Sequence, residues 1–338
     1  MPIRALDLQV DVTDAAGLDE PARVAMTVTL PDELAPQPVL CFAKPGGGYS
    51  RGYYTEALPG PGSGAQATWH AERGWVFVSV DHLGVGGSTV HHDPDRLSFA
   101  PVVAANHAAE QHVLDRLRDG TLADGFPRVT DALLLGIGQS MGGAFTVLQQ
   151  GRFHAYDGIA VLGYSVVHTE PPSRPGEPPI VMPWIPRDAS PSSGIVTNAP
   201  ALADAPPAAL DAMAWGFHFD DVDAEVVRRD LDDFPTRHGD PPPWASSTVP
   251  GAAAIQCLAP GATAPEAAAV RCPVLVAVGE RDVVPDPRGE VRAYLSSPSV
   301  DLFVCPRMAH MHNFGGTREL LWRRIGAWAA WAATVRST

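Results

Sequence analysis

Eight short apolar runs, separated by turns and helix-like segments, constrain most strongly what this chain can fold into. In order they are LDLQVDV, RVAMTVTL, PVLCFA, WVFVSVD, ALLLGIG, DGIAVLGYS, PVLVAVGE and VDLFVCP. The later runs are continuous in Val, Leu and Ile, as expected for strands that are buried on both faces of a parallel sheet. Helix-like segments lie between several runs, at 104–117 and 140–151, and an amphipathic segment closes the chain at 317–335. Strands that alternate with helices predict an α/β sheet.

One segment interrupts this alternation. Eleven prolines fall within residues 171–207, and neither a helix interior nor a central strand accepts proline. A chain of 338 residues is long enough for a core domain that carries an insertion. We therefore predict a core of residues 1–165 and 272–338, with residues 166–271 laid over the sheet. Large aromatic side chains in the insertion argue against a disordered linker. They are Trp184, Trp215, Phe217, Phe219 and Trp244.

The composition excludes several function classes. A formal net charge of −14 disfavours nucleic acids and anionic membranes as partners, because both attract clustered Lys and Arg. No apolar run approaches the roughly 18 residues of a membrane span, and the first residues lack the apolar core of a secretory signal. We expect a cytoplasmic protein, and the sequence leaves its oligomeric state open. The four cysteines have no C-x-x-C spacing, so buried thiols are expected rather than disulfides or zinc ligands.

The pattern Gly-x-Ser-x-Gly occurs twice and marks two candidate nucleophiles, Ser140 and Ser50. Ser140 follows an apolar run and precedes a helix-like one. A serine at such a sharp strand-to-helix turn has a strained backbone and projects its hydroxyl clear of the sheet. Side chains at Gly138 and Gly142 would collide with the adjoining strand and helix. Ser50 follows PGGG, and no helix-like run starts at it. We predict Ser140 as the nucleophile and Ser50 as a loop residue beside the site.

A serine nucleophile needs a base and an acid that orients the base. Asp282 lies in the loop after the apolar run PVLVAVGE, where Glu280 and Asp286 are nearby competitors. The chain order Ser, Asp, His favours Asp282 as the acid. His310 and His312 both follow the last apolar run, so either of them is available as the base.

The sequence neighbours of the other histidines indicate where these residues lie. Polar or loop-like neighbours predict surface positions for His91, His92, His154 and His238. Two histidines one residue apart can also bind a metal, but no Asp, Glu or Cys spacing beside His310 and His312 supports a metal site. We therefore expect no metal and no cofactor.

Five motifs together carry a family resemblance. GQSMGG, PGGGYSRGYY, DHLGVGGS, GERD and MAHMHNF occur in the order and spacing of α/β-hydrolases, which the chain resembles over residues 37–165 and 272–335. The resemblance implies an eight-stranded, mostly parallel sheet flanked by helices, with the insertion as a cap. It also implies a triad of Ser140, Asp282 and His310.

Two finer assignments come from the same resemblance. In the family pattern the catalytic histidine follows a small residue, as His310 follows Ala309, so His312 is expected to orient the loop or line the site. The loop CFAKPGGGYS supplies backbone N–H groups that no side chain hinders, with Pro45 where the family usually has histidine. The resemblance then implies that Gly47 and Met141 donate their N–H groups to the oxyanion.

The resulting hypothesis is a serine hydrolase that cleaves a carboxylic ester or lactone through an acyl-enzyme. A serine nucleophile disfavours dehalogenase and epoxide hydrolase chemistry, which in this fold resembles Asp-based catalysis. A C–C bond hydrolase, or a thioesterase or acyltransferase, is the alternative, because one fold hosts many reactions. A non-catalytic ligand-binding protein has no need of all three triad groups.

The insertion also suggests a substrate class. It is rich in aromatic residues and has few basic ones beyond Arg174, Arg187 and the pair Arg228 and Arg229, so a neutral, apolar, aromatic or macrocyclic substrate is expected. Substrate contacts are expected from residues of the glycine loop, the cap and the histidine loop. They are Gly48, Tyr49, Trp184, Trp215, Phe217, Phe219 and His312.

Overall fold

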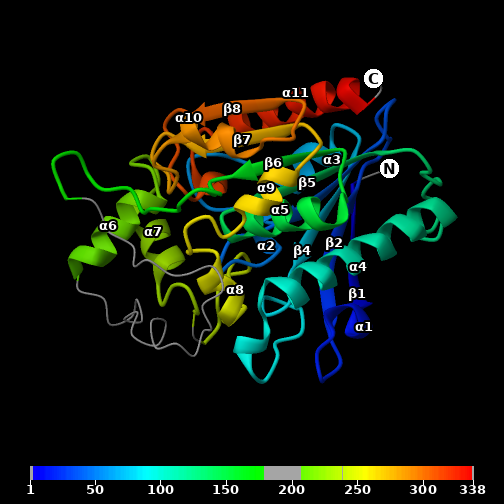
Figure 1. Cartoon of the computed structure of the whole chain (residues 1–338), viewed down its shortest axis with the longest axis horizontal. Helices are drawn as coiled ribbons and strands as arrows, with labels where there is room; N and C mark the ends of the chain where they lie inside the picture. The colour runs from blue at the N-terminus through cyan, green and yellow to red at the C-terminus, as the bar shows by residue number, and fades with distance from the viewer. Residues whose placement is uncertain (1–2, 179–206, 238, 337–338) are drawn as a thin grey trace.

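A computed structural model of the chain describes residues 3–178, 207–237 and 239–336. Within these residues the strands form one eight-stranded sheet in the order β1-β2-β4-β3-β5-β6-β7-β8 (Figure 1). The strands are β1 Arg4–Asp11, β2 Arg23–Leu30, β3 Val39–Lys44, β4 Trp75–Asp81, β5 Leu133–Gln139, β6 Gly158–Leu162, β7 Val274–Gly279 and β8 Val300–Cys305. β2 pairs antiparallel with β1 and with β4, and the later pairings are parallel. The predicted α/β class and its mostly parallel sheet are confirmed.

The strand burial follows from the apolar runs. Every residue of β3, β4, β6 and β7 is buried, which explains why these runs lack polar alternation. Successive side chains point to opposite faces, so Leu40 and Phe42 join one hydrophobic core while Val39 and Cys41 join the other. All four cysteines are buried free thiols, as predicted.

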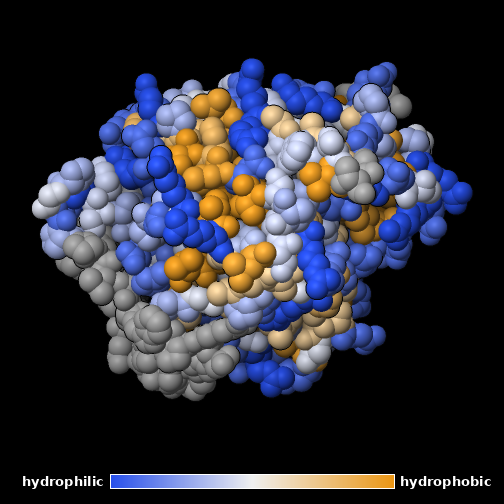
Figure 2. All heavy atoms as spheres, turned by 45° about the horizontal axis from the view of Figure 1, so that its top comes forward, coloured by the Kyte–Doolittle hydropathy of each residue, from blue (hydrophilic) through white to orange (hydrophobic). Residues whose placement is uncertain are grey.

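The edge strand β8 is an exception to the predicted burial. Most of its residues are only partly buried, and Val304 is 44 % exposed. Figure 2 turns the side of the molecule that carries β7, β8 and α11 (Arg318–Arg336) toward the viewer and shows hydrophobic atoms there among polar ones. An edge strand has a partner on one side only, and β8 packs on α11. The expectation of burial on both faces is therefore wrong for this run.

Helices cover both faces of the sheet (Figure 1). α1, α4, α5 and α9 pack together on one face, and α3 and α11 lie on the other. The bounds of the helices other than α11 are α1 Thr13–Ala16, α2 Gly52–Thr55, α3 Gln66–Ala71, α4 Phe99–Asp119, α5 Met141–Phe153, α6 Pro207–Phe217, α7 Ala224–Leu231, α8 Gly251–Gln256, α9 Ala264–Ala269 and α10 Pro287–Glu290. Short 3-10 helices span Pro94–Arg96, Val291–Ala293 and His312–Phe314. In the described part of the chain, no helix has the length and apolar character needed to cross a membrane.

The segment between β6 and β7 has two parts. α6 and α7 stand beyond the ends of the parallel strands, at the left of Figure 1. α8 contacts α4, and α9 contacts α5, so the last part of the segment covers the core helices. The cap boundaries at residues 166 and 271 stay a prediction.

Candidate active site

Ser140 occupies the sharp turn between β5 and α5. Its backbone angles, φ 52° and ψ −122°, fall outside the usual regions for a residue with a side chain. A Cβ atom at Gly142 would overlap the Lys44 carbonyl, and one at Gly138 would overlap the Gly142 carbonyl. Both glycines are therefore required by close backbone approach, as the sequence predicted.

Ser140, His310 and Asp282 come together from the ends of three strands. His310 Nε2 lies 3.1 Å from Ser140 Oγ, and His310 Nδ1 lies 2.6 Å from Asp282 Oδ1. Ser140 follows β5, Asp282 follows β7, and His310 follows β8. In a parallel sheet these carboxyl ends meet at one edge, which brings distant residues into one site. The geometry is that of a nucleophile, a base and an orienting acid.

The carboxylate of Asp282 is fully engaged. Its Oδ1 accepts hydrogen bonds from His310 and from the Val283 amide at 2.8 Å. Its Oδ2 accepts from His312 Nε2 at 2.7 Å and from the Gly279 amide at 2.8 Å. Burial alone would raise the pKa of Asp282, but the two histidines hold it well below its ordinary value. An ionised carboxylate therefore faces both imidazoles.

The competing acids have other roles. The Glu280 carboxylate accepts from the Arg307 amide at 2.8 Å. Asp286 caps α10 by accepting from the Gly289 amide at 3.0 Å. Neither bonds to His310, so the geometry agrees with Asp282 as the acid.

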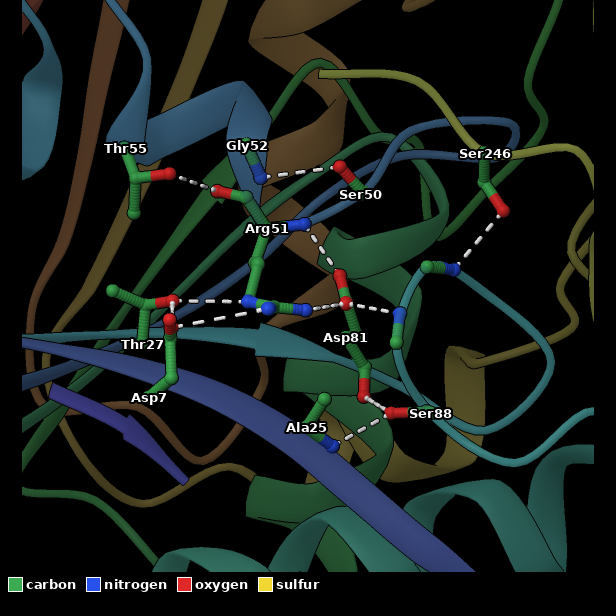
Figure 3. A network of polar contacts seen from close by, with 12 residues as sticks. Asp7, Ala25, Thr27, Ser50, Arg51, Gly52, Thr55, Asp81, Ser88 and Ser246 are labelled. Atoms are coloured by element: carbon green, nitrogen blue, oxygen red, sulfur yellow. Dashed lines mark hydrogen bonds and ion pairs between the residues drawn. The ribbon is translucent and has the colours of Figure 1, made fainter. Parts of the chain in front are cut away.

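Ser50 belongs to a network of polar contacts beside the site. Its hydroxyl donates to the Pro243 carbonyl at 2.8 Å, and its neighbour Arg51 contacts the buried carboxylate of Asp81. Figure 3 shows the contacts of Arg51 and Asp81, in which Arg51 Nε also donates to Thr27 Oγ1 at 2.9 Å. A short helix, α2, does begin after Ser50, which the sequence did not predict. The network fixes the end of the glycine loop to β2 and β4.

The glycine loop places Gly47 beside Ser140. Gly46, Gly47 and Met141 line the same cavity as Ser140. Within the described residues, the amides of Gly47 and Met141 make no hydrogen bond to the protein. Two such N–H groups beside a nucleophile are suited to holding a developing oxyanion.

Comparisons with solved structures give the fold a name. A peroxisomal α/β-hydrolase from Saccharomyces cerevisiae has a TM-score of 0.56 at 14 % identity, with 98 % of this chain and 90 % of that chain covered. The chain has the α/β-hydrolase fold. A proline iminopeptidase from Mycobacterium smegmatis scores 0.61 at 15 % identity, covering 98 % of this chain and 100 % of the other. A thermophilic esterase from Thermogutta terrifontis scores 0.59 at 15 %, covering 96 % and 99 %. No protein-family model matches the sequence, and no curated protein matches it as a relative.

In this α/β-hydrolase fold, Ser140 opens onto an apolar cavity of about 280 Å³. The described side chains that line it come from the strand ends and from the segment after β6, and they include no Asp, Glu, Lys or Arg and no histidine other than His310. They include Met141, Tyr164, Phe217, Phe234, Val249, Ala254, Cys257, Leu258, Val283 and Met311. A small, uncharged group fits this lining best.

The predicted substrate contacts divide into those at the cavity and those elsewhere. Phe217 lines the cavity, and its ring centroid lies 5.0 Å from that of His310. Trp215 and Phe219 line a separate cleft, where the Arg281 guanidinium lies 4.3 Å and 4.7 Å from their ring centroids. Trp184 lies outside the described residues. His312 hydrogen-bonds to Asp282 Oδ2, the carboxylate oxygen that His310 does not contact, and His312 is not among the lining residues.

Gly48 and Tyr49 contact the cap instead of lining the cavity. The Gly48 carbonyl accepts from Arg237 Nη1 and from the Ser246 amide, the latter at 3.0 Å. A Cβ atom at Gly48 would overlap the Pro235 carbonyl. The segment after α7 therefore lies directly on the glycine loop.

Asp230 of α7 is a site residue that the sequence analysis missed. Its Oδ2 accepts from Tyr49 Oη at 2.6 Å and from His218 Nε2 at 2.9 Å, and its Oδ1 accepts from Trp244 Nε1 at 2.8 Å. Burial by itself would raise the pKa of Asp230, but the bonds from His218 and the charge of Arg237 hold it below its ordinary value. One buried carboxylate thus joins the segment between β6 and β7 to the glycine loop.

The histidine loop is also held by residues that the sequence analysis did not single out. The amides of His310 and Met311 donate to the carbonyls of Gly216 and Phe217 at 3.2 Å and 2.8 Å. Gln139, which precedes the nucleophile, donates from Nε2 to the His310 carbonyl at 3.0 Å. A buried polar residue at the end of β5 was a signal that the sequence offered for Gln139.

Proposed function

We propose that the protein is a serine hydrolase that cleaves a carboxylic ester or lactone through an acyl-enzyme. The observation that supports this most is the hydrogen-bonded line of Ser140, His310 and Asp282 beside an apolar cavity. Within the fold, hydrolysis needs a nucleophile, a base and an oxyanion site, and we assign these roles to Ser140, to His310 and to the amides of Gly47 and Met141.

The proposed reaction begins with attack of Ser140 Oγ on the carbonyl carbon, while His310 Nε2 takes the hydroxyl proton. Asp282 stabilises the imidazolium, and the amides of Gly47 and Met141 hold the oxyanion. Collapse of the tetrahedral intermediate expels the alcohol oxygen, which receives the proton from His310. Water, activated by His310 in the same way, then attacks the acyl-enzyme and releases the acid.

The cavity favours a neutral acyl group. A carboxylate or phosphate buried there would meet no Lys or Arg side chain and no histidine other than His310 among the described lining residues, and an unpaired buried charge is strongly disfavoured. A volume of about 280 Å³ favours a single aromatic ring or a small lactone over a macrocycle. Of the substrates expected from the sequence, we therefore propose a neutral aromatic ester or a small lactone.

The solved structures that share this fold have different activities, so we use the cavity lining to choose between those activities for this chain. One is an esterase and another is a proline iminopeptidase. A substrate with a free amine at its end would bring a positive charge, and the described lining of the cavity offers no carboxylate to pair with it. This favours ester over peptide cleavage.

A substrate panel tests the proposal. The purified protein is assayed with a neutral aryl ester, an aromatic lactone, an acetate ester, an anionic acyl thioester and a vinylogous diketone, with Ser140→Ala as the blank. We expect kcat/KM for the first two to exceed that for the acetate ester and the thioester by about tenfold or more. Preference for the thioester would contradict the proposal, and preference for the diketone would support C–C bond hydrolysis instead.

A further inference from the structure

Two consecutive histidines and two consecutive acidic residues lie close together in space, and none of them lines the cavity at Ser140. Asp19 and Glu20 lie in the connection between α1 and β2, and His91 and His92 lie in the loop between β4 and α4. The sequence predicted His91 at the surface, but its exposed fraction is 2 %, so that expectation is wrong. His92 is exposed as predicted, and Glu20 is partly buried.

The donor atoms of this cluster converge. One donor atom from each of Glu20, His91 and His92 lies within 4.8 Å of the others. His91 Nε2 is 3.6 Å from Glu20 Oε1, and His92 Nδ1 is 3.0 Å from Glu20 Oε2. Asp19 Oδ1 lies 2.9 Å from His91 Nε2. Ligands on a tetrahedral zinc ion are about 3.3 Å apart, given bonds of roughly 2.0–2.1 Å. The observed separations fall on both sides of that value.

The buried histidine is oriented as a ligand would be. His91 Nδ1 lies 2.9 Å from the Asp93 carbonyl and 3.0 Å from the Asp93 amide nitrogen, and these contacts turn Nε2 toward the acids. A backbone carbonyl on the other ring nitrogen is the usual partner of a metal-binding histidine. The two imidazole rings are stacked, with centroids 4.4 Å apart.

We propose that Glu20, His91 and His92 bind one divalent transition-metal ion of the zinc class. Two neutral imidazoles and one carboxylate supply three ligands, and the neighbouring carboxylate of Asp19 offsets the remaining positive charge. Nitrogen ligands favour zinc and its transition-metal neighbours over Mg²⁺ and Ca²⁺, which prefer oxygen ligands. The site is separate from the triad, and it does not depend on the proposed function.

A metal at this position clamps two loops together. It joins the connection before β2 to the loop before α4, beside the backbone bond from the Thr89 amide to the Arg23 carbonyl at 2.9 Å. The same loop continues to Leu97, whose carbonyl accepts from the Ala253 amide of α8 at 2.9 Å. Ala254 of α8 lines the cavity. The clamp thus stabilises a loop that supports one wall of the substrate cavity.

Calorimetric titration of Zn²⁺ into the untagged, chelator-treated protein tests the site. Two variants, His92→Gln and Glu20→Gln, remove one ligand each without touching buried His91. His154→Gln is the matched control, because it removes an exposed histidine at the end of α5. We expect one zinc ion per wild-type chain, at least tenfold weaker binding in the two ligand variants, and unchanged binding in His154→Gln. Zinc should also raise the Tm of the wild type more than that of His92→Gln.

Three outcomes would overturn the proposal. Wild-type protein that shows no saturable zinc binding leaves the cluster as histidine–carboxylate ion pairs. Equal zinc affinity in His92→Gln and wild type excludes these residues as ligands. Binding that survives in His92→Gln but is lost in His312→Gln would place the metal at Asp282. Co²⁺ in place of Zn²⁺ gives an independent readout, since its visible absorption bands should be lost in His92→Gln.

Discussion

His312 Nε2 lies 2.7 Å from Asp282 Oδ2, the carboxylate oxygen that His310 does not use. Two histidines therefore share one ionised carboxylate, and the pKa of that carboxylate is held low although the group is buried. The arrangement separates two tasks. His310 faces Ser140, whereas His312 keeps the carboxylate in place from the opposite side.

We predict different costs for the two histidines. His310→Ala removes the proposed base, and we expect kcat/KM to fall by about 10⁴-fold, as when other triads lose a member. His312→Ala leaves Asp282 with three of its hydrogen bonds, from His310, Val283 and Gly279, so a loss of about tenfold is expected. Steady-state kinetics on one aryl ester measures both, and the opposite ranking would show that His312 is the base.

The position of the glycine loop should depend on the hydrogen bond between Tyr49 and Asp230. Tyr49→Phe removes one of the hydrogen bonds that join this loop to the segment between β6 and β7, and we expect kcat to fall about tenfold or more while KM changes little. The reason is that the Gly47 amide acts on the transition state rather than on bound substrate. Tyr294→Phe is the matched control, because Tyr294 is buried and its hydroxyl has no partner in the described residues. Equal kcat values in the two variants would show that the bond does not position the loop.

Because His70 is buried, we predict that the free energy of unfolding falls at acidic pH. Its ring stacks on Trp75, with centroids 4.3 Å apart, and burial lowers the pKa of His70 to about 3. Between about pH 6.5 and 3 the unfolded chain binds a proton here that the folded chain does not, so the free energy of unfolding falls as the pH drops. The loss is ~1.4 kcal/mol per pH unit, or about 2 kcal/mol at pH 5.

His70→Phe should remove this part of the pH dependence, because phenylalanine keeps the stacking and cannot bind a proton. Urea denaturation at pH 7 and pH 5 measures the change, with His154→Gln as an exposed control. Some dependence should persist, because burial also lowers the pKa of His82 to about 3. An unchanged pH dependence in His70→Phe would mean that His70 binds a proton in the folded state.

Lys44, the single lysine of the chain, forms a buried ion pair below the glycine loop. Its Nζ lies 2.6 Å from Glu110 Oε1 and 2.7 Å from Tyr156 Oη. Lys44→Met leaves the carboxylate of Glu110 buried and unpaired, so we expect it to destabilise the fold by about 3–5 kcal/mol. The double variant Lys44→Met with Glu110→Gln should recover most of that loss. Urea denaturation of both variants tests this, and additive losses would contradict it.

Local patterns were sufficient for the sheet and for the nucleophile turn. The apolar runs identify the strands because strand burial depends on a few neighbouring residues. Gly138 and Gly142 identify the turn because the close approach of backbones there leaves no room for a Cβ atom. The bonds of Ser140 to His310 and of His310 to Asp282 were expected from chain order and from family resemblance.

The cap was harder to predict because its contacts depend on tertiary packing. Trp215 and Phe217 are two residues apart at the end of α6, and helical residues two apart point about 200° from each other. Phe217 therefore lies against His310 while Trp215 lies against Arg281. Asp230 lies between Glu225 and Asp232, two other acidic residues of the same stretch, and nothing local marks it as the buried one.

The most direct test of the account is to find which serine a phosphonate probe labels. The intact protein is treated with an aryl phosphonate, and mass spectrometry counts the adducts and locates them by peptide mapping. Ser140→Ala and Ser50→Ala are treated in parallel, with circular dichroism to confirm that both are folded. We predict one adduct on Ser140 in the wild type and in Ser50→Ala, and none in Ser140→Ala. An adduct on Ser50, or labelling that persists in Ser140→Ala, would contradict Ser140 as the nucleophile.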